Sequence, residues 1–220
     1  MKKERDPVTI EKIKENYSAR RIAIRARLAE FEAIWQTETD ERIWEEMVFC
    51  FFTGGCSAKM GLRSIEAVRP LLMTGTHDEL MNALVGTHRY PRARAGYIVA
   101  SREFLTGHCQ MRLRTKLASF TNDLERRDWL VKEKRIKGLG YKEASHFLRN
   151  IGLKGYAILD KHILRSLAEL GFITDPTPPG NRTKYLAIET KLKELANQLK
   201  IDFDELDLVL WSLKTGEILK

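Results

Sequence analysis

Apolar residues recur at helical spacing along most of this 220-residue chain. In residues 8–35 they fall mainly every three or four positions among charged residues, which predicts a long amphipathic surface helix. Residues 41–53 become apolar on all sides in their second half, which predicts a buried central helix. Gly54 and Gly55 follow directly, and glycine is a poor helix former, so we expect the helix to stop there.

The same spacing predicts helices along the rest of the chain. Thr76 and Glu79 form a capping-box pattern, and Asp160 fits the N-cap of its helix. Residues 171–184, with three prolines and two glycines, form the one long loop. No stretch alternates for long enough to predict a strand, so we expect an all-α fold of about ten helices. The further predicted helices cover residues 58–72, 76–84, 93–105, 113–120, 123–134, 141–151, 160–170, 185–199 and 203–213.

Charge and cysteine content indicate the environment. The formal net charge of +8 favours a polyanionic partner such as nucleic acid. Cys50, Cys56 and Cys109 are unclustered, which indicates a reducing compartment and excludes a four-cysteine iron–sulfur cluster. No apolar run follows the first six residues, and the longest one, residues 47–52, is too short to span a bilayer. We therefore expect a cytoplasmic protein without a signal peptide.

Residues 135–144 carry the most informative local pattern. One helix ends, Gly138 and Gly140 form a tight turn, and a new helix begins. Glycine permits a positive φ and lets another molecule approach the backbone, while a helix N-terminus suits a phosphate. Between residues 131 and 150 six basic residues stand against two acidic ones. The pattern predicts a helix–hairpin–helix that holds a DNA backbone without reading its bases.

Two residues near this turn suggest chemistry. Lys142 lies two positions after Gly140, and Asp160 follows it by eighteen positions, behind an apolar run. A lysine amine can attack C1′ of a nucleotide, displace the base and form a Schiff base. A rigidly held carboxylate can stabilise the oxocarbenium-like charge and manage protons. On spacing alone, Lys142 also fits a solvated charge and Asp160 a simple helix cap.

Two blocks, residues 137–150 and 157–165, closely resemble the helix–hairpin–helix DNA glycosylase/AP lyases. Within that superfamily the chain is similar to the compact, archaeal-type branch of 8-oxoguanine DNA glycosylases. Residues 206–220 support this branch, which typically ends on a functional lysine. The resemblance implies two helical lobes with the helix–hairpin–helix at the cleft. We expect residues 41–154 to form the central lobe, and residues 1–40 with 155–220 to form the second.

The resemblance also implies an activity. The enzyme would flip 8-oxoguanine out of double-stranded DNA, displace it through a lysine Schiff base and cleave the abasic strand by β-elimination. It would need no cofactor and no metal, bind no membrane and act as a monomer.

Roles follow from the resemblance position by position. Lys142 would be the nucleophile and Asp160 its carboxylate partner. Gly138, Gly140 and His162 would contact backbone phosphates. The flipped base would meet His146, Asp207 and Trp211, Lys220 would recognise the lesion, and Tyr90 would fill space near the estranged base. Each of these residues also has a simpler interpretation without the resemblance. His146 and Trp211 could be core residues, and Asp207 could be a surface charge. Tyr90 could be a turn residue, and Lys220 could belong to a frayed terminus.

One departure from the family pattern concerns Gly54 and Gly55. The family usually continues with Ala-Asn after Cys50-Phe51-Phe52-Thr53, and the asparagine helps to hold the opened duplex. Its absence predicts a relaxed preference for the base opposite the lesion. Pro91 also stands where an aromatic residue is common in the family. This leaves Tyr90 as the single candidate for the wedge, the aromatic side chain that fills the space near the estranged base.

Two alternatives stay open at this point. The first is a related glycosylase for another oxidised base, such as an oxidised pyrimidine, although its usual members carry a cysteine cluster absent here. The second is a noncatalytic helix–hairpin–helix module, in which Lys142 only contacts a phosphate.

Overall fold

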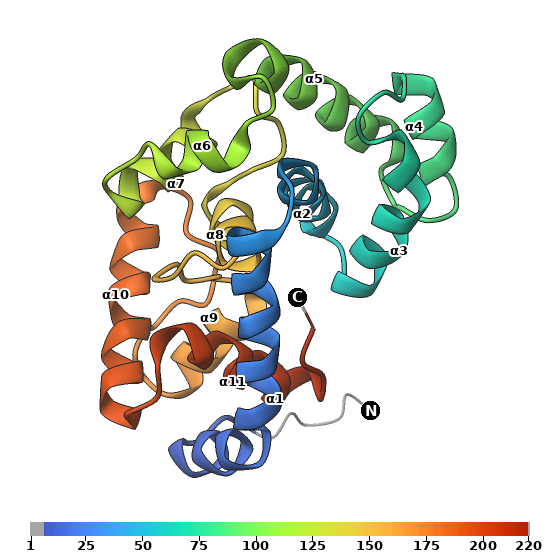
Figure 1. The fold of residues 1–220 in the computed structure, drawn as a ribbon. Helices are drawn as coiled ribbons and strands as arrows, with labels where there is room; N and C mark the ends of the chain where they lie inside the picture. Colours follow the sequence, from blue (N-terminus) through green and yellow to red (C-terminus); the bar gives the residue numbers. More distant parts are fainter. Residues whose placement is uncertain (1–6, 220) are drawn as a thin grey trace. The chain divides into compact units, whose positions relative to one another are not determined.

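The computed structural model describes residues 7–219, and every regular element in that range is helical. The predicted all-α class is therefore confirmed (Figure 1). Eleven α-helices and one 3₁₀ turn occur in these residues. They are α1 Ile10–Thr37, α2 Asp40–Thr53, α3 Ala58–Val68, η1 Arg69–Leu71, α4 His77–Leu84, α5 Pro91–Cys109, α6 Leu113–Ala118, α7 Asp123–Lys132, α8 Tyr141–Asn150, α9 Lys161–Glu169, α10 Arg182–Leu199 and α11 Phe203–Thr215.

Contacts within the described chain cluster into two compact units. One unit holds residues 31–153, and the other holds residues 7–30 and 154–219. Each unit has its own buried apolar core. The division into a central lobe of residues 41–154 and a second lobe of both chain ends stays a prediction.

Helix α2 is the centre of the unit formed by residues 31–153. It packs against α3, α5, α6 and α8 (Figure 1). Its residues from Glu46 to Thr53 are all buried, which confirms the predicted central helix. The helix ends at Thr53, as expected from the two glycines, and Gly55 has a φ of +73°. Helix α2 therefore provides the rigid base on which α8 lies.

Polar groups fix α8 on α2. Glu46 is fully buried on α2, and its Oε1 pairs with Nη2 of Arg42 at 2.6 Å. Its other oxygen accepts a hydrogen bond from the Asn150 side chain at 3.2 Å. A buried carboxylate is costly unless it is paired, so this arrangement disfavours any other register between the helices. The C-terminal end of α8 is thereby anchored.

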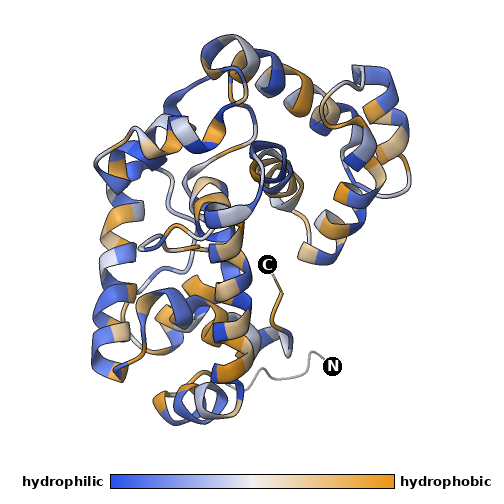
Figure 2. Ribbon diagram, viewed as in Figure 1, coloured by the Kyte–Doolittle hydropathy of each residue, from blue (hydrophilic) through white to orange (hydrophobic). Residues whose placement is uncertain are grey.

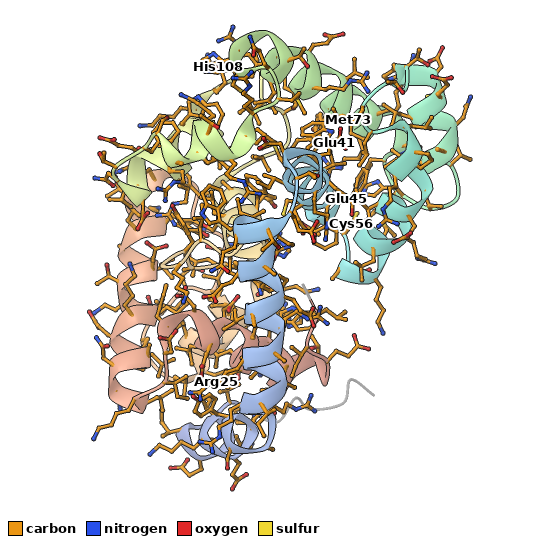
Figure 3. All side chains as sticks on the ribbon, viewed as in Figure 1. Arg25, Glu41, Glu45, Cys56, Met73 and His108 are labelled. Atoms are coloured by element: carbon orange, nitrogen blue, oxygen red, sulfur yellow. The ribbon has the colours of Figure 1, made fainter. Side chains whose placement is uncertain are left out.

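The second unit contains α9, α10, α11 and the first part of α1. Helix α11 packs on α9 and α10. Arg25 of α1, labelled in Figure 3, donates to Glu205 of α11 at 2.7 Å, and Tyr17 donates to the same carboxylate at 2.5 Å. This arrangement raises the pKa of Tyr17, mainly through its hydrogen bond to Glu205. In Figure 2, hydrophobic and hydrophilic residues alternate along α10, as expected for an amphipathic helix.

A buried non-helical segment leads to α9. Residues 156–159 are buried and lack helical hydrogen bonding. The Ala157 N–H donates to Glu189 at 3.1 Å, and its carbonyl accepts from the Tyr185 hydroxyl at 2.7 Å. Gly155 donates to Asp204 at 2.8 Å. Side chains of α10 and α11 thus satisfy this backbone and fix the entrance to α9.

Several predicted boundaries need correction. The predicted helix over residues 58–72 is wrong in its last turn, because the α-helix ends at Val68 and a 3₁₀ turn follows. Pro70 lies in that turn, where it lacks the N–H that a continued α-helix requires. Helix α5 begins earlier than predicted, with Pro91 as its first residue, a position that suits the fixed φ of proline. Helix α10 also begins earlier, because Asn181 caps it through the N–H of Lys184 at 2.9 Å.

Within residues 7–219, none of the helices combines the length and apolar character needed to cross a bilayer.

Candidate active site

The predicted helix–hairpin–helix is formed by α7, residues 133–140 and α8. Two contacts hold its helices together. Nη1 of Arg127 on α7 donates to the Ser145 hydroxyl on α8 at 3.1 Å, and both side chains are buried. Tyr141, the first residue of α8, donates to Asp128 of α7 at 3.1 Å. The turn between the helices is therefore supported from both sides.

The two glycines of the turn have different conformations. Gly138 has a φ of +79°, as expected for a glycine-specific position. A Cβ on Gly138 would lie 2.6 Å from Cδ2 of Tyr97, so the turn packs directly on α5. Gly140 instead has a φ of −85°, so only Gly138 uses the positive φ that glycine permits. Gly140 is the N-cap of α8 and has no side chain between the backbone and an approaching phosphate.

Lys142 lies in the first turn of α8, as predicted. Its side chain is 25% exposed, and its Nζ lies 3.2 Å from Oε1 of Glu143, whose side chain is 17% exposed. The Glu143 carboxylate also faces two glycine backbones. Its oxygens lie 3.2 Å and 3.6 Å from the points where Cβ atoms would stand on Gly140 and Gly54. Glu143 is not among the residues predicted for the site, although its place beside Lys142 was the available signal.

His146 lies one turn after Lys142 and is buried. Its ring meets Phe49 of α2 edge to face, with centroids 5.6 Å apart. In this unit the histidine therefore packs as a core residue. A role of His146 in lining the pocket for the flipped base stays a prediction.

Asp160 and His162 lie at the start of α9, in the other unit. Asp160 is the N-cap, and its Oδ1 accepts the N–H groups of His162 at 2.8 Å and Ile163 at 2.9 Å. The predicted cap is thus confirmed. The second oxygen of the carboxylate takes no part in these two bonds. A catalytic role for Asp160 stays a prediction.

Helix α11 carries two of the residues predicted to meet the base. Asp207 is 6% exposed, so the reading of this residue as a surface charge is wrong. Trp211 is only partly buried, one turn further along the helix. Burying a carboxylate requires specific compensation, which makes Asp207 a strong candidate for a dedicated role. Lys220 lies outside the described residues.

Tyr90 precedes α5 and is 44% exposed. The guanidinium of Arg89 lies over its ring at 5.3 Å, and that of Arg94 lies 5.8 Å from it. Arg94 is largely buried, and its Nη2 donates to the Gly54 carbonyl at 2.7 Å. The glycine pair after α2 and the start of α5 are therefore joined. An exposed aromatic ring at a fixed position is compatible with the predicted wedge.

His88 fixes the backbone of this segment. Its Nδ1 accepts the N–H of Tyr90 at 2.9 Å, so the proton of the neutral ring must lie on Nε2. Nε2 then donates to the Phe52 carbonyl at 3.1 Å. Burial lowers the pKa of His88 and the charge of Arg94 lowers it further, while the bond to Phe52 opposes this effect. The segment before α5 thus depends on a neutral histidine.

This dependence predicts a loss of stability in acid. The pKa of His88 is lower in the folded chain than its ordinary value of 6.5, so the unfolded chain binds the extra proton first. The contribution is complete above pH 6.5 and declines as the pH falls from 6.5 towards the lowered pKa. Urea unfolding at several pH values should show that His88→Phe flattens this decline. His77, which is more exposed and lies beside Asp78, provides the control His77→Gln. An equal flattening in both variants would contradict the role of His88.

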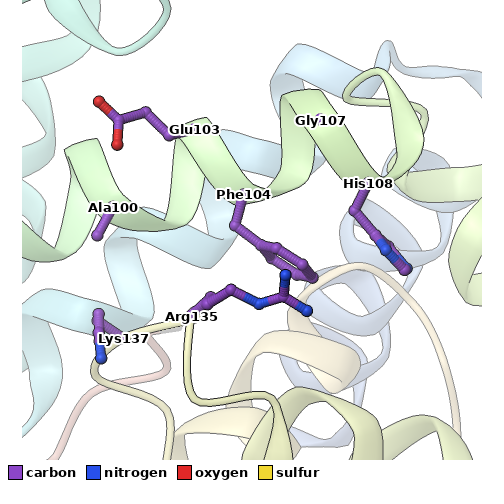
Figure 4. Close-up of a pocket in the computed structure, with 7 residues that line it drawn as sticks. All are labelled: Ala100, Glu103, Phe104, Gly107, His108, Arg135 and Lys137. Atoms are coloured by element: carbon purple, nitrogen blue, oxygen red, sulfur yellow. The ribbon is translucent and has the colours of Figure 1, made fainter.

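A surface groove of about 530 Å³ lies beside the hairpin (Figure 4). Arg135 lies along it, with its guanidinium 4.2 Å from the centre of the Phe104 ring. Nε and Nη2 of Arg135 donate to the two carboxylate oxygens of Glu133 at 2.8 and 2.9 Å. This pairing lowers the pKa of Glu133 to about 2. The Lys137 N–H donates to the buried Ser101 hydroxyl at 2.9 Å. These contacts fix residues 133–137 of the hairpin against α5.

The structure therefore distributes the predicted site residues over its two units. Lys142, His146, Gly138, Gly140 and Tyr90 belong to residues 31–153. Asp160, His162, Asp207 and Trp211 belong to the other unit. Within residues 7–219, no group of three or more histidine, cysteine, aspartate or glutamate residues has a metal-binding arrangement.

Comparison with known proteins gives a family match over most of the chain. Residues 24–201 match the family model of the 8-oxoguanine DNA glycosylases. The chain is 42% identical to an 8-oxoguanine DNA glycosylase/AP lyase of Korarchaeum cryptofilum, with 90% of each chain covered. It is 35% identical to a protein of the same name from Fusobacterium nucleatum, with 96% of each covered.

A solved structure extends this similarity to the fold. The Methanocaldococcus jannaschii 8-oxoguanine glycosylase/lyase, in complex with DNA containing 8-oxoguanine, matches with a TM-score of 0.87 and 36% identity. The match covers 96% of this chain and 99% of that one. The chain therefore belongs to the family of 8-oxoguanine DNA glycosylases.

Proposed function

We propose that the protein excises 8-oxoguanine from double-stranded DNA and cleaves the strand at the resulting abasic site. The observation that carries this proposal is the position of Lys142. It lies in the first turn of α8, directly after the glycine hairpin, in a chain 42% identical to a glycosylase/AP lyase. A phosphate held at the hairpin would bring a nucleotide beside an amine.

The reaction follows from lysine chemistry. The neutral Nζ of Lys142 attacks C1′, and the bond to the base breaks with its electron pair leaving on the base. The attached nitrogen loses a proton and the C1′–O4′ bond then breaks, with its electron pair and a proton going to O4′, so that the opened sugar is held to Lys142 as a Schiff base. Loss of a proton from C2′ and departure of the 3′ phosphate complete the β-elimination. In this scheme Asp160 stabilises the positive charge that develops on the sugar.

The DNA contacts follow from charge and backbone geometry. Gly140 offers the N-terminus of α8, and Gly138 and His162 provide further phosphate contacts in the proposal. Between residues 86 and 116 seven basic residues stand against one acidic residue, which supports a second phosphate-binding surface. We propose that the protein does this as a cytoplasmic monomer, without a cofactor.

An excision assay tests this function against the alternatives. Duplexes carrying 8-oxoguanine, an oxidised pyrimidine or no lesion, each with every opposite base, are incubated with the full chain. We expect free 8-oxoguanine and a nicked strand only from the first duplex. The absence of Asn after Gly54 predicts comparable rates for several opposite bases. Binding of all three duplexes without excision would instead indicate a noncatalytic DNA-binding module.

Recognition of the base should be separable from the chemistry. We expect Asp207→Asn to slow excision of 8-oxoguanine by about 10-fold or more. The substitution replaces a buried carboxylate oxygen, which would accept a hydrogen bond from the base edge, with an amide nitrogen, which can only donate one. Cleavage of a ready-made abasic site should change much less. Single-turnover rates on the two duplexes measure this difference. Equal losses of rate on both substrates would contradict a role of Asp207 in base recognition. Trp211→Ala and Lys220→Ala can be compared in the same assay.

A further inference from the structure

We propose that Glu143 is a catalytic residue that accepts the proton of the Lys142 ammonium and so generates the nucleophile. This inference rests on the proposed function and assigns a step that the pairing of Lys142 with Asp160 leaves open. All the geometry that supports it lies within residues 31–153, which form one compact unit.

The position of the carboxylate supports this role. Oε1 of Glu143 lies 3.2 Å from Nζ of Lys142, which is within reach of direct proton transfer. Both side chains are mostly buried, so solvent screens the contact less than at an exposed ion pair.

Two glycines provide the space for the carboxylate. Oε2 lies 3.2 Å from the position of a Cβ on Gly140, and Oε1 lies 3.6 Å from that of Gly54. A larger side chain at Gly140 would crowd the carboxylate, and one at Gly54 would stand against it. The end of α2 and the hairpin therefore enclose Glu143 beside the lysine.

The chemistry requires such a group. At neutral pH a lysine carries a proton on Nζ, and the ammonium has no electron pair with which to attack C1′. In the proposed step the Nζ–H bond breaks, its electron pair stays on nitrogen, and a lone pair of Glu143 Oε1 binds the proton. Lys142 becomes a neutral amine and Glu143 a neutral acid. Glu143 passes the proton to water before the next turnover.

Asp160 is less suited to this step. Its Oδ1 already accepts two backbone N–H groups of α9, which hold the carboxylate as a helix cap. The division of labour would then be simple: Glu143 removes the proton from the nucleophile, and Asp160 stabilises the charge on the sugar.

Other charged groups lie near Gly54 or contact side chains along α8. Arg94 reaches from α5 to Gly54, with Nη2 3.2 Å from the position of its Cβ. From α7, Asp128 and Arg127 contact Tyr141 and Ser145, and from α2, Glu46 contacts Asn150. His146 follows one turn along α8. Of these, Arg94 is the group that meets Gly54 together with Glu143.

The test is the pH dependence of covalent trapping. Full-length wild type and Glu143→Gln react with a duplex containing a ready-made abasic site, in the presence of borohydride, from pH 5.5 to 9.5. Glutamine keeps the shape of the side chain and cannot accept the proton. We expect trapping about 100-fold slower than wild type at neutral pH. The gap should narrow as the pH rises, because hydroxide then deprotonates the lysine.

The controls separate this role from a structural one. Glu66 pairs with Arg69 on the surface of the same unit, and Glu66→Gln should keep the wild-type profile. Binding to a duplex with an unreactive abasic analogue should be equal for wild type and Glu143→Gln, which shows that the variant is folded. A loss of trapping rate that is constant over pH would overturn the proposal. It would also be overturned if Asp160→Asn, and not Glu143→Gln, shifted the pH below which trapping slows. If wild type itself forms no adduct, the proposed function fails first.

Discussion

Lys142→Gln is expected to abolish both excision and strand cleavage while the protein still folds and binds DNA. A glutamine amide is not a nucleophile, so no Schiff base can form. The single-turnover rate on 8-oxoguanine DNA should fall by about 10⁴-fold or more. The side chain of Lys142 is partly exposed, so no core packing is lost. Rates are measured by strand cleavage and base release, and folding by circular dichroism.

Lys137→Gln is the matched control, because it removes the same charge from an exposed lysine of the same hairpin. This variant should bind DNA somewhat more weakly and more so at high salt, with little change in single-turnover rate at saturating enzyme. If both variants lost rate to the same extent, Lys142 would be only a phosphate contact.

Gly138→Ala is expected to destabilise the unit of residues 31–153 by about 2–4 kcal/mol. Two effects combine. The φ of +79° is unfavourable for alanine, and the new Cβ would lie 2.6 Å from Cδ2 of Tyr97, whose ring packs edge to face on Phe51. Relief requires movement of the turn away from α5, which would also disturb the approach to Lys142. Urea unfolding gives the stability, and filter binding gives the affinity for abasic DNA.

Gly140→Ala separates stability from DNA contact at the same turn. Gly140 has an ordinary φ of −85°, and an added Cβ would meet only the end of the Glu143 side chain. We expect a change in unfolding free energy below about 1 kcal/mol and a clear loss of DNA affinity. Equal destabilisation by the two variants would contradict the different roles assigned to the glycines.

Local signals in the sequence predicted much of the fold. Helical periodicity found the helices, and Thr76 and Asp160 were identified as caps because a cap depends on residues two or three positions away. The glycine turn and the position of Lys142 in the first turn of α8 were predictable because they also depend on residues close together in the sequence. The end of α3 was missed because a 3₁₀ turn through Pro70 continues a helical pattern of side chains.

The residues that support the site were harder to predict, because they depend on distant parts of the chain. Glu143 meets Gly54 and His88 meets Phe52 only after α2, α5 and α8 have packed. The buried segment at residues 156–159 is likewise satisfied by Tyr185 and Glu189, which lie far along the chain. Periodicity carries no information about such pairs, whereas chemistry within the motif can at least suggest Glu143.

The most direct test of the central claim is to identify the residue that bonds to DNA. Wild-type protein is trapped with borohydride on a duplex containing 8-oxoguanine, digested with trypsin and analysed by mass spectrometry. We predict a single adduct, in which Nζ of Lys142 is bonded to C1′ of a base-free deoxyribose. It should lie within the peptide of residues 138–149, which arises because trypsin does not cleave after a modified lysine. An adduct on a different lysine, or none while 8-oxoguanine is still released, would contradict the account.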